Sequence, residues 1–158
     1  MSEGKGHCLC GAVSFTVKNM NYSVDTCHCG MCRRWGGGPL MFVDCRTHVT
    51  FEGEENITVY DSSEWAERAF CKKCGSHLFY RLKKNNAHQM LVGQFNEQKQ
   101  FHFDLQVYMD RKPAFYTFGN KTRELTEAET IEEFGPEQNT KQAHAVGTPS
   151  TLRAPFRR

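Results

Sequence analysis

Residues 70–79 read Phe70-Cys71-Lys72-Lys73-Cys74-Gly75-Ser76-His77-Leu78-Phe79, with two cysteines three residues apart immediately before a glycine. A loop of this spacing lets both sulfurs converge while backbone N–H groups point at them, which is half of a tetrahedral zinc site. The glycine permits the turn because it tolerates positive φ. The segment therefore predicts a metal-binding turn whose other ligands come from elsewhere in the chain.

The remaining cysteines supply those ligands. Of eight cysteines, seven fall into three groups, which are Cys8-Leu-Cys10, Cys27-His-Cys29-Gly-Met-Cys32, and the pair Cys71 and Cys74. Sulfurs at such mixed spacings cannot converge from a regular strand, because neighbouring side chains alternate between its two faces. We therefore expect all three groups to lie in turns, helped by the glycines that follow Cys10, Cys29 and Cys74.

Seven grouped thiolates divide naturally as four plus three. The two pairs combine into a closed site that is typical of structural zinc, with the ligands Cys8, Cys10, Cys71 and Cys74. The triplet Cys27, Cys29 and Cys32 is dense enough to hold one ion by itself. Three protein ligands leave a fourth position for water or substrate, as in a catalytic zinc site, so the triplet is the candidate active site.

Two alternatives remain open at this point. Disulfides between the groups would need an oxidising compartment, which nothing else in the sequence indicates. The triplet is also compatible with a second structural site, completed by His28, by another histidine or by a partner chain. Cys45 follows Phe42 and Val43 in an apolar stretch and is expected to be a small buried side chain without a ligand role.

The length and charge of the chain limit its class. The 158 residues suit one domain of ordinary size. Lys plus Arg number 20 and Asp plus Glu 18, a net charge of +2, which gives no electrostatic footprint for nucleic acid or an anionic membrane. The sequence has no apolar run long enough to span a bilayer and no secretory signal at its start, so we expect a cytoplasmic protein.

Hydrophobic periodicity indicates a mainly β fold. Apolar residues alternate with a period of two in eight segments: 12–17, 40–44, 49–52, 57–60, 68–70, 77–81, 89–95 and 105–109. One short helix is expected near the C-terminal end, where Thr126 and Glu129 form a capping-box pattern and Gly135-Pro136 stops the helix. Its residues Ile131 and Phe134 are placed to face inward.

The final segment differs in composition from the rest. Residues 141–158 contain four basic residues, no acidic residue and two prolines, without helical or strand periodicity. Such a segment buries too little apolar surface to offset its ordering entropy. We therefore expect a zinc-binding domain over residues 4–136 and a flexible basic tail over 137–158.

The order of the motifs resembles the GFA/CENP-V domain family, which includes the glutathione-dependent formaldehyde-activating enzyme. The matching motifs are Gly6-His-Cys8-Leu-Cys10-Gly11, Cys27-His-Cys29-Gly-Met-Cys32-Arg33, Gly36-Gly37-Gly38 and Phe70–Phe79. The resemblance implies a fold of the β-tent type with two zinc ions. It also implies that Cys8, Cys10, Cys71 and Cys74 hold the structural zinc and that Cys27, Cys29 and Cys32 hold the catalytic one.

The activity implied by this resemblance is a carbon–sulfur lyase reaction of the S-(hydroxymethyl)glutathione synthase type. The partners would be a small-molecule thiol such as glutathione and a small aldehyde, with neither nucleic acid nor membrane. The alternative is a non-catalytic, zinc-stabilised binding module. Arg33 and Arg34 are candidates to bind a carboxylate of a peptide thiol, and Trp35 before three glycines is a pocket wall or a core residue. His28 and His77 are either hydrogen-bonding neighbours of the metal sites or ordinary buried histidines.

Overall fold

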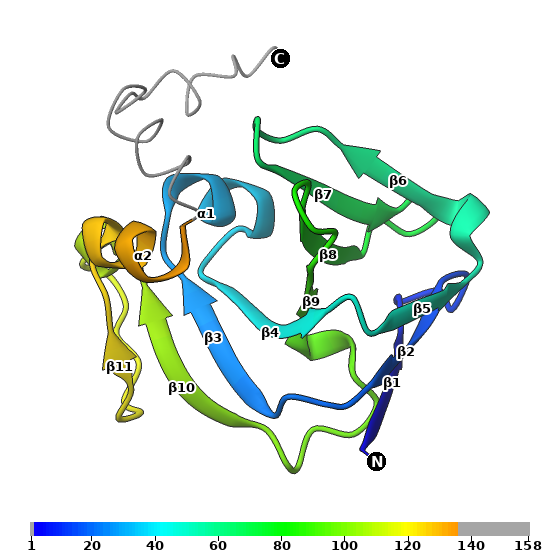
Figure 1. The fold of residues 1–158 in the computed structure, drawn as a ribbon, viewed down its shortest axis with the longest axis horizontal. Coiled ribbons are helices and arrows are strands. Elements are labelled where there is room, and N and C mark those ends of the chain that lie inside the picture. Colours follow the sequence, from blue (N-terminus) through cyan, green and yellow to red (C-terminus); the bar gives the residue numbers. More distant parts are fainter. Residues whose placement is uncertain (1, 136–158) are drawn as a thin grey trace. The chain divides into compact units, whose positions relative to one another are not determined.

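The computed structural model of the chain describes residues 2–135. Within them the fold is mainly β, with two short α-helices, α1 (Gly30–Gly36) and α2 (Glu127–Phe134) (Figure 1). The strands are β1 (Glu3–His7), β2 (Ser14–Lys18), β3 (Ser23–Cys27), β4 (Leu40–Arg46), β5 (Val49–Glu52), β6 (Ile57–Tyr60), β7 (Ala66–Cys71), β8 (His77–Leu82), β9 (His88–Leu91), β10 (His102–Val107) and β11 (Arg123–Glu124). Short 3-10 helices are η1 (Glu54–Asn56), η2 (Val92–Gln94) and η3 (Met109–Arg111). The predicted mainly β class is confirmed.

The tail predicted at 137–158 lies outside the described residues, and the domain boundary predicted at 136 stays a prediction. The chain divides into two compact units. Within the described residues, unit 1 comprises residues 2–25 and Met41–Asp104, and unit 2 comprises Thr26–Leu40 and residues 105–135. The four cysteines predicted to form the closed site all belong to unit 1, and the triplet belongs to unit 2. Each cysteine group therefore lies within one unit.

Unit 1 contains two antiparallel arrangements of strands. In the first, β2 pairs with β1 on one side and with β5 on the other, so that Phe15 lies opposite Gly6 and Phe51. In the second, β4, β9, β8, β7 and β6 follow one another, each pair antiparallel (Figure 1). The period-two alternation of apolar residues predicts most of these strands, because alternate side chains of a strand point to the same face of its sheet.

Aromatic and aliphatic side chains fill the core of unit 1. The ring of Phe15 meets Phe95 edge-on with centroids 5.1 Å apart and is tilted against Phe51 at 6.4 Å. Gly6 is required beside them, because a Cβ there would lie 2.3 Å from the carbonyl oxygen of Gln94 and 2.4 Å from the Phe15 ring. Cys45 is buried in the same core, as predicted, and burial raises the pKa of its thiol to about 12.

Unit 2 is built on the ends of β3 and β10 and on the segments that follow them. The backbone N–H of His28 donates to the carbonyl of Val107, and β11 runs parallel to β10, with Arg123 opposite Leu105. Helix α2 begins at the predicted capping box, in which the Thr126 hydroxyl and the Glu129 carboxylate each accept a backbone N–H from the other residue.

The expectation that Phe134 faces inward is wrong, because 57% of the residue is exposed, whereas Ile131 is half-buried. The strand predictions also differ from the structure at identifiable places. The segments Val49–Glu52 and Ile57–Tyr60 match β5 and β6 residue for residue. The alternation of apolar residues does not predict strands β1 and β3, because Glu3–His7 contains no large apolar residue and Ser23–Cys27 contains a single aliphatic one, Val24.

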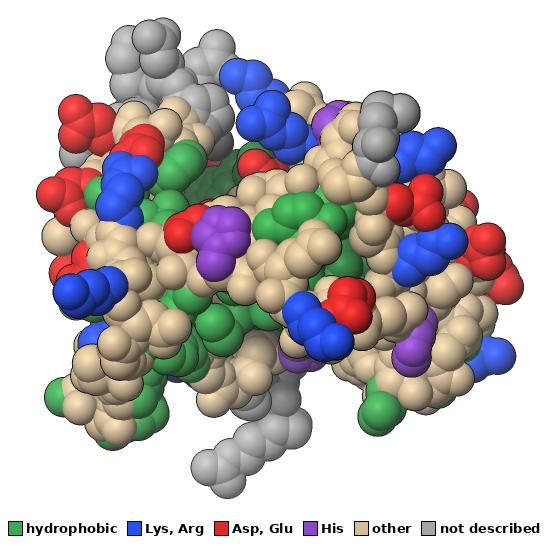
Figure 2. Space-filling view, turned by 90° about the horizontal axis from the view of Figure 1, so that it is seen from below, with side chains coloured by type: hydrophobic (Ala, Val, Ile, Leu, Met, Phe, Trp, Pro, Cys, Tyr) green, Lys and Arg blue, Asp and Glu red, His purple; other side chains and the backbone are tan. Residues whose placement is uncertain are grey.

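Charged side chains of both signs are interspersed on the face drawn in Figure 2, consistent with the near balance of the sequence. This face of the described residues therefore has no broad region of one sign that would attract a polyanion. Among the described residues, no helix has the length and apolar character needed to cross a membrane.

Candidate metal centres

The four cysteines of unit 1 come together from two segments. Cys8 follows β1 and is held by a backbone hydrogen bond from its N–H to the carbonyl of Val13, 2.9 Å. Cys71 ends β7, and its carbonyl accepts the N–H of Gly75 at 2.7 Å, which closes the turn that carries Cys74. Gly11 and Gly75 adopt φ of 77° and 76°, so the predicted left-handed turns after Cys10 and Cys74 are confirmed.

The sulfurs of this cluster are spaced as zinc ligands are. The Sγ atoms of Cys8 and Cys10 lie 3.7 Å apart, those of Cys10 and Cys71 lie 3.8 Å apart, and all four sulfurs lie within 4.8 Å of one another. A tetrahedron with zinc–sulfur bonds of about 2.3 Å has sulfur–sulfur edges of about 3.8 Å. A disulfide would need about 2.05 Å, and all eight cysteines are free thiols. The donor set therefore fits a metal ion and not a disulfide.

Ser76 ties the two halves of this cluster together. Its hydroxyl accepts the backbone N–H of Leu9 at 2.9 Å and lies 3.2 Å from the Sγ of Cys74. The hydrogen bond from the hydroxyl, followed by one from the backbone of Ser76, lowers the pKa of Cys74 to about 5. A thiol held in this way is readily a thiolate, the form that binds a metal. The sequence did not single out this role of Ser76, because a lone serine after a glycine has no recognisable spacing signal.

The three cysteines of unit 2 are held differently. Cys27 is the last residue of β3, Cys29 caps the N-terminus of α1, and Cys32 lies inside α1. The Sγ of Cys29 accepts the backbone N–H of Cys32 at 3.3 Å, and the three sulfurs lie within 4.8 Å of one another. Hydrogen bonds with the thiols of Cys29 and Cys32, together with burial, raise the pKa of Cys27 well above its ordinary value. A cation is therefore needed before three such close thiols can all ionise.

The expectation that this group lies in a turn is wrong for its second half, which is helical. The sequence did not predict α1, because its seven residues include two glycines and a tryptophan, all weaker helix formers than alanine. Local contacts provide the stability instead: Cys29 caps one end, and Gly37, at φ 81°, returns its N–H to the carbonyl of Arg33 at the other. Gly30 consequently begins the helix and does not form a left-handed turn.

His28, which lies between Cys27 and Cys29 in the sequence, is completely buried. Its Nδ1 lies 2.7 Å from the hydroxyl of Tyr116 and its Nε2 lies 2.9 Å from Oε1 of Gln106. The amide nitrogen of Gln106 donates in turn to the Thr122 hydroxyl at 2.9 Å. Burial lowers the pKa of His28, and the nearby positive charges of Lys112 and Arg33 lower it further against the opposing hydrogen bond to Gln106.

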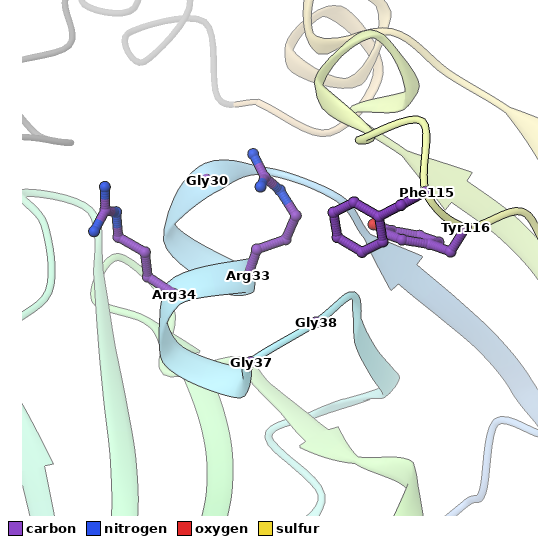
Figure 3. A pocket seen from close by; sticks show the side chains of 7 residues that line it. All are labelled: Gly30, Arg33, Arg34, Gly37, Gly38, Phe115 and Tyr116. Carbon is purple, nitrogen blue, oxygen red and sulfur yellow. The ribbon is translucent and has the colours of Figure 1, made fainter.

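A pocket of about 380 Å³ lies beside this helix. Its lining residues are Gly30, Arg33, Arg34, Gly37, Gly38, Phe115 and Tyr116 (Figure 3). Gly30 and Arg33 are the chain neighbours of Cys29 and Cys32. The Nε–H of Arg33 donates to the carbonyl of His28 at 2.9 Å, which anchors the arginine at the pocket.

Only some of the residues that line the pocket were singled out from the sequence. Arg33 and Arg34 line it, together with two of the three glycines, and their binding of a carboxylate stays a prediction. Trp35 is half-buried and is not one of the lining residues, and His77 pairs with Phe70 across β7 and β8. Phe115 and Tyr116 were missed altogether, because they lie more than 80 residues beyond the triplet in a loop that carries no motif.

The fold and the two cysteine clusters define a mainly β protein with two candidate metal centres, one of four thiols and one of three. The sequence matches the family described as glutathione-dependent formaldehyde-activating enzyme (GFA) over residues 3–111. The chain therefore belongs to the GFA family. This match includes all seven grouped cysteines.

Two individual relatives accompany this family match. The chain is 35% identical over 132 residues to the Schizosaccharomyces pombe protein named uncharacterized lyase C29B12.13, an alignment that spans 83% of this chain and 96% of the relative. A solved structure of a Rhodobacter sphaeroides protein, a structural genomics target, is 28% identical and covers 58% of this chain and 87% of its own, with a TM-score of 0.49. The word lyase in this name belongs to the relative, and the family description names an enzyme.

Proposed function

We propose that this protein is a zinc-dependent carbon–sulfur lyase-type enzyme that acts on thiol adducts of small aldehydes, as S-(hydroxymethyl)glutathione synthase does. One zinc would be held structurally by Cys8, Cys10, Cys71 and Cys74. A second, catalytic zinc would be held by Cys27, Cys29 and Cys32. The proposal rests on one observation above all, that the cluster with three sulfurs adjoins a pocket through Gly30 and Arg33.

The chemistry of the reaction is an addition without any change of oxidation state. The S–H bond of the thiol breaks, a C–S bond forms to the aldehyde carbon, and the proton ends on the former carbonyl oxygen. The lyase direction reverses each of these changes. When bound, zinc would act as a Lewis acid that lowers the pKa of a thiol or polarises a carbonyl.

The residues of the pocket suit a peptide thiol. A volume of about 380 Å³ falls within the range of roughly 300–1,000 Å³ that is typical of small-molecule sites. The guanidinium of Arg33 offers two parallel N–H donors, the arrangement that a carboxylate accepts best. In Figure 3 the Arg33 side chain lies between Arg34 and the ring of Phe115, so a ligand bound there would have charge on one side and an aromatic wall on the other.

The first experiment is the metal content of the freshly purified, reduced chain, measured by mass spectrometry before and after dialysis against excess glutathione. The proposal predicts two zinc ions per chain, of which one becomes labile when the thiol competes for the open position. The same samples would be tested by exchange NMR for faster interconversion of glutathione and its formaldehyde adduct. Two zinc ions that both persist, with no acceleration of exchange, would favour the non-catalytic binding module.

A further inference from the structure

The hydrogen bonds around His28 determine which of its two nitrogens carries the proton. The Oε1 of Gln106 can only accept, and it lies 2.9 Å from Nε2, so Nε2 is the donor. In this orientation the amide nitrogen of Gln106 also has a partner, because it donates to the hydroxyl of Thr122 at 2.9 Å. In a neutral imidazole the other nitrogen, Nδ1, is then an acceptor.

The consequence falls on Tyr116. Its hydroxyl lies 2.7 Å from Nδ1 of His28, and an acceptor nitrogen requires the phenol to donate its one proton there. The two rings are also stacked, with centroids 5.5 Å apart and planes 29° from parallel. The phenol oxygen therefore has only lone pairs to offer to anything else.

The phenol is held at the pocket from a second side. The ammonium group of Lys112 donates to the carbonyls of Pro113 and Tyr116 and lies 5.0 Å from the centre of the Tyr116 ring. In Figure 3 the side chains of Phe115 and Tyr116 both point toward α1, with the tyrosine oxygen directed toward Arg33. Burial raises the pKa of the Tyr116 phenol above its ordinary value, so the hydroxyl keeps the proton that it donates to Nδ1 of His28.

We propose that Tyr116 is a specificity-determining residue that accepts a hydrogen bond from a donor on the ligand, and that His28 is the positioning residue that makes it an acceptor. On the proposed function, the donor is the hydroxyl group of the thiol–aldehyde adduct, which neither the aldehyde nor a simple thioether possesses. The site would thereby distinguish the adduct from ligands of the same size without a hydroxyl. This inference rests on the proposed function for the identity of the ligand.

The test uses two stable thioethers of glutathione with equal numbers of non-hydrogen atoms, S-(2-hydroxyethyl)glutathione and S-propylglutathione. Their dissociation constants for the zinc-loaded protein would be measured by calorimetry for wild type, for Tyr116→Phe and for Tyr108→Phe. We expect wild type to prefer the hydroxyl ligand about threefold to tenfold, the worth of one hydrogen bond. Tyr116→Phe should lose this preference, and the control Tyr108→Phe, which removes a hydroxyl outside the pocket lining, should keep it.

Two further measurements address the positioning role of His28. In wild type, ¹⁵N NMR should show an unprotonated Nδ1 on His28, and a protonated Nδ1 would overturn the inference. Gln106→Leu removes the acceptor for Nε2–H, and it should reduce the hydroxyl preference while leaving the affinity for S-propylglutathione within twofold. A purely structural role of Gln106 would weaken both ligands equally, which would also overturn the assignment of His28.

The outcomes separate this inference from the proposed function. If both thioethers bind wild type with the same affinity, Tyr116 is not the discriminating residue, although the pocket still binds a glutathione derivative. If neither binds, the proposed function itself is contradicted and this inference with it. Loss of the preference in Tyr116→Phe alone supports both.

Discussion

The four-cysteine cluster of unit 1 and the three-cysteine cluster of unit 2 use the same ligand atom in opposite settings. In the first, the sulfurs lie in two turns that are closed by backbone hydrogen bonds and joined by Ser76, and the four thiols have the spacing of a tetrahedron. In the second, a strand end and a short helix bring together three thiols, and the chain neighbours of two of them line a pocket. On the proposed function, the number of ligands and the surrounding side chains, rather than the ligand type, distinguish the structural centre from the reactive one.

The largest effect is expected for Cys71→Ser, which removes one ligand from the closed cluster. Binding of a structural zinc is worth about 10–16 kcal/mol, comparable to the whole stability of a small domain. We therefore expect the variant to lose zinc and its cooperative thermal transition, followed by circular dichroism. Cys45→Ala, at a buried cysteine outside both clusters, should keep both zinc ions and unfold cooperatively. A folded Cys71→Ser protein that retains two zinc ions would show that the two pairs do not form one site.

Cys29→Ser should separate activity from stability. A serine hydroxyl can still cap α1 by accepting the N–H of Cys32, so the helix keeps its N-terminal hydrogen bond. The expected result is one zinc per chain, no acceleration of glutathione–formaldehyde exchange, and a midpoint that falls by only a few degrees. A large drop in the midpoint, together with no activity in wild type, would make the triplet a second structural centre.

Arg33→Met tests whether the pocket beside the triplet binds the carboxylate of a thiol. Hydrogen bonds to charged groups are worth about 1.5–3 kcal/mol, so KM for glutathione should rise at least about tenfold. Because the bound carboxylate is remote from the reacting atoms, kcat should change little. Arg34→Met is the matched control, since its side chain lies on the far side of Arg33 from Phe115 in Figure 3, and a smaller rise is expected. Equal effects of the two variants would argue for general electrostatic attraction.

The smallest expected effect is on the pH dependence of the free energy of unfolding and concerns His88. Measured at constant zinc, it distinguishes protonation of a histidine in unit 1 from loss of the metal. Burial, with the ring of Phe79 4.8 Å away, lowers the pKa of His88 below its ordinary value. The unfolded chain therefore binds the proton first as the pH falls, so the free energy of unfolding should decrease below about pH 6.5. His88→Gln should reduce this dependence in denaturant titrations at constant zinc, because His28 and His77, whose pKa values burial also lowers, still contribute to it. His48→Gln, at an exposed histidine of the same unit, should leave the dependence unchanged.

The sequence was most informative where the signal is local. The spacing of the cysteines predicted the grouping into four and three, and the pattern Thr126 to Glu129 predicted the start of α2. Helix α1 escaped prediction because its stability comes from two caps and not from its residues' helix propensities. Tyr116 and Gln106 escaped because their contacts with His28 span 88 and 78 residues, and no spacing rule reports a partner at that distance.

The hydrogen bond from Leu9 to Ser76 has a consequence for the order of events during synthesis. It spans 67 residues, and the sulfur contact between Cys10 and Cys71 spans 61. During synthesis, Cys8 and Cys10 leave the ribosome before Cys71 and Cys74. Their two thiols therefore lack the other two ligands of the cluster until the second pair emerges. Contacts of such separation form slowly because a long loop must close first. Until then the pair Cys8 and Cys10 is open to oxidation or to binding of the wrong metal.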